Sequence, residues 1–173
     1  MAGIFRCEPL ANLATPGETR YFQSMSVEIT RRGAGTKYPT AALRKIAAGL
    51  LFELKQQRAE LSIALVGDGE MRPLNRRYRK KNKTTDVLSF IIEDQPQSGL
   101  LLLGDVVISV EQARRQAKER HKTLKSEMVT LLIHGILHLL GYDHERSARQ
   151  AKIMFALERK LQTRLCERGL LKV

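Results

Sequence analysis

Short apolar runs along the chain predict four strands. Residues 26–30 (SVEIT) alternate apolar and polar side chains with the period of two that a strand requires. Residues 61–67 (LSIALVG) form an apolar run that is typical of a buried strand. Two further runs, TDVLSFII from Thr85 and LLLGDVVISV from Leu101, enclose the polar, turn-rich segment EDQPQSG. This order predicts a hairpin-like or flexible connection between the last two strands.

Apolar side chains that recur every three or four residues predict about five helices. Thr40, Asp68 and Ser109 precede three of these segments and are expected to act as N-caps. Gly141 is expected to end the fourth helix, because glycine commonly follows a helix C-terminus. The predicted ranges, each to within a few residues, are 41–57, 69–79, 110–122, 125–140 and 146–168.

The order of these elements predicts an α+β fold, in which a small mixed four-stranded sheet is packed with about five helices. A three-layer α/β domain is the alternative that the same order allows. The chain has 173 residues, which suffices for one domain with a buried core, and we assign that domain to residues 25–173. Residues 1–24 contain Pro9, Pro16 and Gly17 and no clear period, which predicts an irregular N-terminal extension.

The charge of the chain is the first property that bears on function. The 30 Lys and Arg residues exceed the 18 Asp and Glu residues, and the formal net charge is +12. Such an excess favours an anionic partner, with nucleic acid first and an acidic membrane surface second. A basic surface that serves only solubility is the alternative.

The same sequence carries no signal for a membrane or for secretion. No apolar run reaches the length of about 18 residues that a membrane span needs, and residues 1–24 lack the apolar core of a secretory signal. The two cysteines, Cys7 and Cys166, form no C-x-x-C pair, which favours a reducing compartment. We therefore expect a cytoplasmic protein that does not bind a membrane.

Three of the four histidines lie in the segment LLIHGILHLLGYDHE, with the spacing H-x-x-x-H-x-x-G-x-x-H. His134 and His138 share one face of a helix, and a chain reversal at Gly141 would bring His144 to the same point. Three imidazoles with an open fourth position are typical of a catalytic zinc site, although nickel, copper or iron could bind the same ligands. Histidines buried without partners would cost roughly a few kcal/mol each, which disfavours a purely structural role.

The residues around this site favour a polyanionic substrate over a peptide. The spacing matches the metzincin metallopeptidases, but these enzymes place a glutamate base directly after the first histidine, where this chain has Gly135. The segment RRYRKKNK (residues 76–83) contains six basic residues in eight, and a second basic cluster extends from Arg114 to Lys125. Guanidinium groups bind phosphate in a bidentate manner, whereas an isolated charged run would be only a solvated face.

Three segments, LNRRYRKKNKTTDVLSF, LGDVVIS and HGILHLLGYDH, resemble the YbeY family of bacterial single-strand endoribonucleases that mature ribosomal RNA. The resemblance covers roughly residues 26–165 and implies an α+β fold and a metal site of His134, His138 and His144. It also implies that Arg79 is functionally important. Thr84 and Ile91 depart from the family pattern, which usually has proline at the first position and commonly at the second.

The resemblance further implies a biological role. It implies action in 16S rRNA 3′-end maturation and in ribosome quality control. The implied partners are ribosomal RNA and the small ribosomal subunit, together with a ribosome-associated GTPase. A metallopeptidase and a non-catalytic ribosome assembly factor with structural zinc are the competing functions.

The expected chemistry is cleavage of an RNA phosphodiester bond. Zn²⁺ held by the histidines would acidify a water and polarise a phosphoryl oxygen, and Arg79 would offset the charge that builds on the phosphoryl group. Asp86, Asp105, Asp143 and Glu145 are candidates for the general base or for orienting a ligand histidine. Attack by water and attack by the RNA 2′-hydroxyl both remain open.

Overall fold

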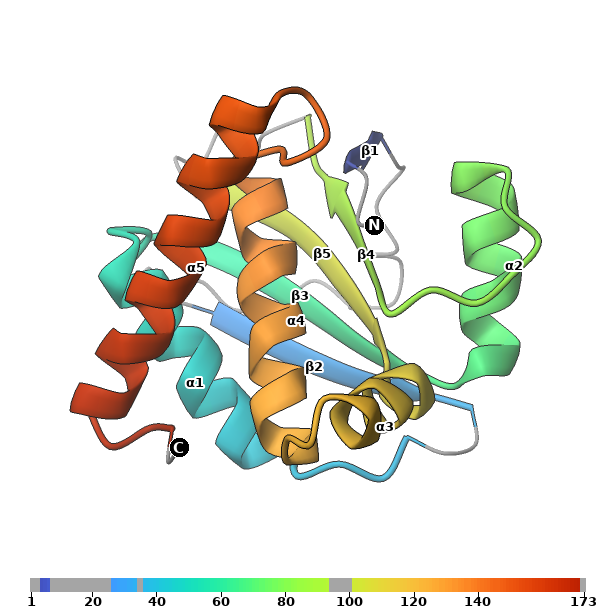
Figure 1. Ribbon diagram of the computed structural model, residues 1–173, viewed down its shortest axis with the longest axis horizontal. Helices are drawn as coiled ribbons and strands as arrows, with labels where there is room; N and C mark the ends of the chain where they lie inside the picture. The colour runs from blue at the N-terminus through green and yellow to red at the C-terminus, as the bar shows by residue number, and fades with distance from the viewer. Residues whose placement is uncertain (1–3, 7–25, 34–35, 94–100, 172–173) are drawn as a thin grey trace, which may run out of the picture.

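The structure, a computed structural model, describes residues 4–6, 26–33, 36–93 and 101–171 (Figure 1). One mixed sheet has the strand order β1-β4-β5-β3-β2. In chain order, its strands are β1 (Ile4–Arg6), β2 (Ser26–Arg32), β3 (Ala59–Val66), β4 (Val87–Ile91) and β5 (Leu101–Ser109). The pair β4–β5 is antiparallel and the other neighbouring pairs are parallel. The helices are α1 (Thr40–Glu53), α2 (Asp68–Arg79), α3 (Val110–Glu119), α4 (Leu124–Leu139) and α5 (Ala148–Glu167).

The two faces of the sheet carry two separate apolar clusters. Helices α1, α4 and α5 cover one face and enclose the larger core with it, as Figure 1 shows. Helix α2 packs on the other face through Met71, Leu74 and Tyr78. Successive side chains of a strand point to opposite faces, so Val106 joins the larger cluster while Val107 joins the α2 cluster.

Helix α4 lies at the centre of the larger core. It contacts β4, β5 and helices α1, α3 and α5, so nearly every side of it is covered. A helix enclosed in this way can be apolar around its whole circumference, which explains the leucines and isoleucines that surround the histidines in the sequence.

The predicted α+β architecture is confirmed, with five helices and the four predicted strands in a mixed sheet. The short strand β1 adds a fifth strand beside β4. It lies in the segment predicted to be mostly irregular and is a three-residue exception to that prediction; residues 1–3 and 7–24 lie outside the described residues. The β4–β5 pair is antiparallel as a hairpin requires, while residues 94–100 of its connection lie outside the described residues.

The three predicted N-caps have different outcomes. The hydroxyl of Ser109 accepts a hydrogen bond from the Gln112 backbone N–H at 3.1 Å and caps α3 as predicted. Thr40 and Asp68 are not caps, since the cap positions of α1 and α2 are Pro39 and Gly67 and neither makes a side-chain cap.

Asp68 instead holds three segments together. Its Oδ1 accepts hydrogen bonds from the hydroxyls of Ser109 (2.8 Å) and Thr84 (3.2 Å), and its Oδ2 pairs with Arg115 at 2.6 Å. The carboxylate thereby links the start of α2, the start of α3 and the loop that leads into β4. Thr84, one of the two positions that depart from the family pattern, contributes its hydroxyl to this link.

Gly135 allows α4 to approach the sheet closely. A Cβ atom at this position would lie 2.6 Å from Cγ1 of Val106, which is closer than real contacts allow. The hydroxyl of Ser89 on β4 donates a hydrogen bond to the carbonyl of Gly135 at 3.1 Å. The position after the first histidine of the motif therefore faces the sheet and has no room for a side chain.

We expect Gly135→Ala to destabilise the fold by about 1–3 kcal/mol, because overpacking outweighs the roughly 1 kcal/mol that alanine gains in helix propensity. Denaturant unfolding measures this difference. Gly69→Ala in α2 is the matched control, since a Cβ there meets nothing within 4 Å. The control should be neutral or slightly more stable than wild type, and equal stability of the two variants would contradict the prediction.

No helix within the described ranges combines the length and the apolar character that crossing a bilayer requires.

Candidate metal centre

The three histidines of the motif converge at the C-terminal end of α4. His134 and His138 lie one turn apart, and their ring centroids are 4.7 Å apart. Gly141 has φ +86°, a left-handed conformation that suits glycine, and it turns the chain after the helix as predicted. His144 returns to the first two rings, with centroid distances of 5.0 Å to His134 and 5.2 Å to His138. One ring nitrogen from each residue lies within 4.8 Å of the others.

The donor atoms of this cluster fit a transition metal. The Nε2 atoms of His134 and His138 are 3.1 Å apart. Two imidazole nitrogens bound to one tetrahedral zinc ion at about 2.0–2.1 Å would be roughly 3.3 Å apart, so the two rings need only a small adjustment. The histidine triad could therefore hold a metal ion, and an imidazole donor set suits zinc, copper, iron or nickel.

The environment keeps two of these rings neutral. Burial, together with the charges of the nearby His134 and His144, lowers the pKa of His138 to about 4. Burial and the charge of His134 also lower the pKa of His144. A neutral imidazole is the form that binds a divalent metal, so protons compete little with a metal for these two rings at neutral pH.

Glu158 of α5 fixes the orientation of the first histidine. Its Oε1 lies 2.6 Å from Nδ1 of His134, so a proton on Nδ1 is donated to the carboxylate and Nε2 is left with its lone pair toward His138. A carboxylate in this position also raises the basicity of a ligand histidine.

Glu158 was not among the site residues predicted from the sequence, although a signal for it exists. The buried residues of α5 are Met154, Leu161 and Leu165, and Glu158 falls on the same stripe at spacings of three and four. A carboxylate on the apolar stripe of a helix needs a buried partner. That signal identifies the residue but not the partner.

Arg79 is the last residue of α2, and the chain turns away after it because Lys80 has φ +57°. Its guanidinium Nη2 lies 3.5 Å from Oε2 of Glu145, the residue that follows His144. The Arg79 side chain is only 9% exposed, and its charge contributes to the lowered pKa of His138. The fold thus brings Arg79 to the histidine cluster from a distant part of the chain, in an enclosed position rather than on the open surface.

Two of the four acidic candidates flank the third histidine. Asp143 accepts a hydrogen bond from the Glu145 backbone N–H at 2.8 Å and pairs with Arg146 at 3.2 Å, so it stabilises the turn that carries His144. Glu145 pairs with Arg79. Both are near enough to the cluster to influence it, and neither is assigned as the base.

The other two candidates lie away from the histidines. Asp105 hydrogen-bonds with Ser62 of β3, and burial raises its pKa. It adjoins Val106, which faces α4, so Asp105 points to the opposite face of the sheet. Asp86 accepts a hydrogen bond from Nε2 of Gln116 on α3 at 3.0 Å. The prediction that Asp105 serves the metal site is therefore wrong, and Asp86 makes no described contact with the three histidines.

Comparison with known proteins decides the family. A family model described as "Endoribonuclease YbeY" matches residues 28–166. The endoribonuclease YbeY of Myxococcus xanthus is 46% identical over 171 residues, which cover 98% of this chain and 56% of that protein. The chain belongs to the endoribonuclease YbeY family. A second YbeY family member, from Persephonella marina, is 45% identical over 132 residues, which cover 76% of this chain and 84% of the relative.

A solved structure shares the fold. The solution structure of a Thermotoga maritima protein matches with a TM-score of 0.58 and 27% identity, over 82% of this chain and 90% of that one. Arg79, the three histidines and Glu158 all lie within the segment that the YbeY family model covers. This chain spans 56% of the length of the Myxococcus relative. Similarity therefore assigns the family to this chain but not the activity of that whole protein.

We expect Glu158→Gln to weaken zinc binding by about 10–100-fold, because an amide polarises His134 less than a carboxylate does. Competition titration with a chromogenic chelator measures the affinity. Glu167→Gln is the matched control on the same helix, where Glu167 pairs only with the exposed Arg164 in the described contacts. Equal affinities of the two variants would show that Glu158 does not support the metal site.

Proposed function

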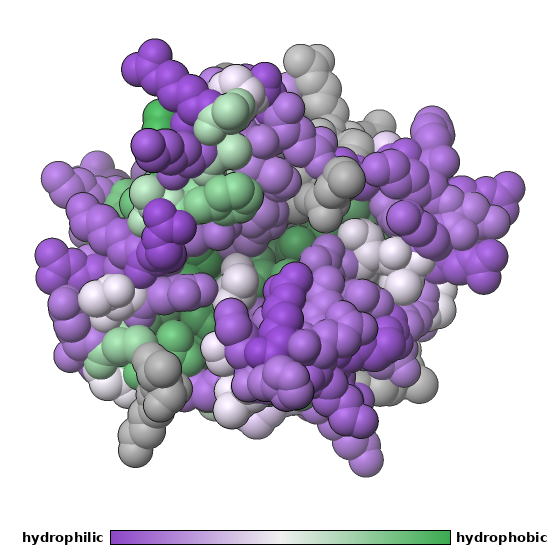
Figure 2. Space-filling model, in the orientation of Figure 1, coloured by the Kyte–Doolittle hydropathy of each residue, from purple (hydrophilic) through white to green (hydrophobic). Residues whose placement is uncertain are grey.

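We propose that this protein is a zinc-dependent endoribonuclease that cleaves single-stranded RNA. The observation that carries the proposal is the convergence of three histidines beside the enclosed guanidinium of Arg79. The net charge of +12 and the membership of the YbeY family support RNA as the substrate. Figure 2 shows that the surface over α2 and α3 is mostly hydrophilic, and the basic run begins in the last turn of α2.

The residues of the chain would share the catalytic work as follows. His134, His138 and His144 hold the ion, and Glu158 keeps the first of these rings oriented. When bound, a divalent metal supplies Lewis acidity at a phosphoryl oxygen and lowers the pKa of a water. Arg79 would bind the same phosphoryl group through its guanidinium and offset the charge of the transition state.

The biological role that we propose is 16S rRNA 3′-end maturation and ribosome quality control. Ribosomal RNA within the small ribosomal subunit is the proposed substrate, and a ribosome-associated GTPase is a proposed partner. The proposed place of action is the cytoplasm, where these particles assemble.

Parallel incubations test the proposed activity. Zinc-loaded protein is mixed with a single-stranded RNA, with the same RNA annealed to its complement, and with casein, each with and without a chelator. We expect cleavage of the single strand alone, loss of cleavage with the chelator and recovery with added Zn²⁺.

The other outcomes correspond to the competing functions. Digestion of casein would indicate a metallopeptidase, which the enclosed Gly135 at the place of the glutamate base disfavours. Intact RNA in the presence of stoichiometric bound zinc would indicate an assembly factor with structural zinc. A substrate with a 2′-deoxy nucleotide at the scissile position separates the two routes of attack, since undiminished cleavage excludes the 2′-hydroxyl.

A further inference from the structure

Phe155 of α5 is an aromatic side chain at the surface of the protein, beside the metal centre. It is 41% exposed, and the centre of its ring lies 5.8 Å from the centre of the His144 ring. The two ring planes are inclined at 36°, so the rings do not lie flat against each other and part of the Phe155 ring faces solvent. Single exposed apolar side chains are common in proteins, so the informative feature is the position of this one against a member of the histidine triad.

The turn of α5 that carries Phe155 also supports the triad. Oε1 of Glu158, three residues further along the helix, lies 2.6 Å from Nδ1 of His134. Residues three apart share one side of a helix, so Phe155 and Glu158 face the metal centre together. The packing of α5 on α4 that brings Glu158 to His134 therefore also places the Phe155 ring at the rim of this centre.

Arg79 reaches the same segment of the chain from α2. Glu145 directly follows His144, and its Oε2 lies 3.5 Å from Nη2 of Arg79. Two consecutive residues, His144 and Glu145, thus contact an exposed aromatic ring and an enclosed guanidinium. A single-stranded nucleic acid has the two complementary groups, a planar base and an anionic phosphate, joined through one sugar.

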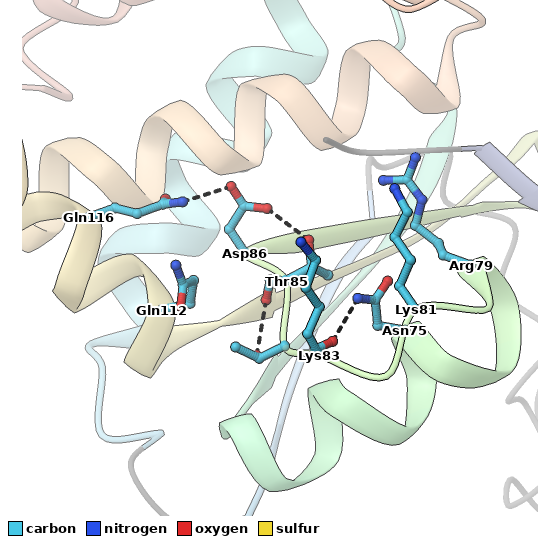
Figure 3. A pocket seen from close by; sticks show the side chains of 9 residues that line it. Asn75, Arg79, Lys81, Lys83, Thr85, Asp86, Gln112 and Gln116 are labelled. Carbon is cyan, nitrogen blue, oxygen red and sulfur yellow. Dashed lines mark hydrogen bonds between the residues drawn. The ribbon is translucent and has the colours of Figure 1, made fainter.

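Basic side chains continue from Arg79 along a polar pocket of about 210 Å³ (Figure 3). Lys81 and Lys83 line this pocket together with Arg79, and both lysines are exposed. Asp86 also lines the pocket and repels an anion, so the exposed lysines are the place where a phosphate fits. A strand that passes Arg79 can therefore continue over cations on the α2 side of the metal centre.

Basic side chains also flank the aromatic ring on α5. Lys152 and Arg159 lie three residues before and four residues after Phe155, so they share its side of the helix, and both are exposed. An aromatic ring between cations is typical of single-strand binding surfaces, in which the cations follow the backbone and the ring stacks on a base. An apolar protein surface would not complement these two cations, so a nucleic acid fits the ring and its neighbours better.

We propose that Phe155 stacks on a base of the RNA strand next to the scissile phosphodiester and thereby contributes to the selection of single strands. The inference rests on the proposed function, because it assumes an RNA strand at the metal centre. Stacking uses the face that every base has, so the contact accepts all four bases. It requires a base that has left its neighbours, which a single strand provides and a duplex does not.

The substitution Phe155→Trp converts the proposed contact into an optical signal, because the chain contains no tryptophan. The zinc-loaded full chain with this change is titrated with a short single-stranded RNA and with a strand of the same length in which abasic sugars replace the nucleotides. We expect the RNA to quench the tryptophan fluorescence, and the abasic strand, which carries the same phosphates, to leave it nearly unchanged. Equal quenching by the two strands, or no quenching by RNA, would overturn the proposal.

The matched control for this signal is Ile153→Trp. Ile153 is 48% exposed, and it lies on the other side of the buried Met154 from Phe155. A tryptophan there points away from the metal centre and should keep its fluorescence when RNA is added. Equal responses of the two tryptophans would show general binding of RNA to α5 and would also overturn the proposal.

The substitution Phe155→Leu measures what the native ring contributes, because leucine keeps an apolar side chain beside His144 but has no aromatic face. We expect the affinity for a single-stranded, 2′-O-methylated RNA that stays intact during the measurement to fall by about 5–50-fold. The affinity for the annealed duplex and the zinc content should stay at the wild-type level, and Phe155→Trp should retain the affinity for the single strand. Equal losses for single strand and duplex, or loss of zinc in place of RNA affinity, would show that the ring only supports His144 and would overturn the proposal.

Binding and cleavage are measured separately, so the two proposals can fail separately. Base-dependent quenching without cleavage of RNA would support the stacking contact and reject the nuclease function. Cleavage of RNA together with wild-type affinity in Phe155→Leu would reject the stacking contact and leave the nuclease function in place.

Discussion

Replacing His138 by alanine is expected to remove both the metal and the RNA cleavage activity. His138 is fully buried between His134 and His144, and only the histidine triad emerges as a possible metal cluster within the described residues. Loss of one of three ligands should reduce bound zinc from one ion per chain to a small fraction. Cleavage should fall by about a thousand-fold, since the Lewis acid contributes several kcal/mol to the transition state. Metal analysis after gel filtration and the initial rate on single-stranded RNA measure the two effects.

The control for this variant is His121→Asn. His121 is an exposed histidine in the turn after α3, with φ +52°, a conformation that asparagine tolerates. It should retain zinc and activity. Because the ring of His138 is buried, the melting temperature of His138→Ala must be measured as well. Full zinc content and full activity in a folded His138→Ala protein would refute the metal site.

The same variant tests the biological proposal. In cells whose only copy carries His138→Ala, precursors of 16S rRNA with unprocessed 3′ ends should accumulate. Mapping of the rRNA ends measures this, with the His121→Asn strain as the reference. Normal 3′ ends in the His138→Ala strain would contradict the maturation role. They would not contradict RNA cleavage by the purified protein.

The histidine triad was predictable because its geometry is local. His134 and His138 share a helix face through a spacing of four, and Gly141 sets the chain reversal that returns His144 within the same short segment. No contact with a distant part of the chain is needed to predict that these rings meet.

Partners from other elements were not predictable in the same way. Glu158 reaches His134 only because α5 packs on α4 in one particular register, which no local pattern specifies. Arg79 was singled out through the resemblance to a family, and its approach to Glu145 depends on the placement of α2 at the opposite face of the sheet.

The failed predictions have the same origin. The sequence places Asp105 in a motif but does not show on which face of the sheet its side chain lies. Its side chain points away from the face that α4 and the histidines cover. Asp68 has the residue type of an N-cap but is the first residue inside α2, after Gly67, and its carboxylate bonds the hydroxyls of Ser109 and Thr84 and the guanidinium of Arg115. Strand β1 is three residues long and depends on pairing with β4, so its own sequence carries almost no signal.

Arg79→Ala is expected to lower the turnover of RNA by about 10²–10³-fold while zinc content stays at the wild-type level. The guanidinium is enclosed beside Glu145 and influences His138 electrostatically, but it is not a metal ligand. Removal should therefore affect the transition state more than metal binding. Single-turnover cleavage at matched zinc content measures the effect, and substrate affinity is measured separately with an uncleaved analogue.

Two further variants separate a positioned guanidinium from general positive charge. Arg79→Lys keeps the charge but loses the planar, bidentate group, so it should recover only a small part of the lost turnover. Arg76→Ala removes an exposed cation from the same helix and should weaken RNA binding slightly, with a reduced salt dependence and an unchanged turnover. If Arg79→Ala instead behaves like Arg76→Ala, Arg79 is one member of a basic surface and the charge that develops on the phosphoryl group must be stabilised by other residues.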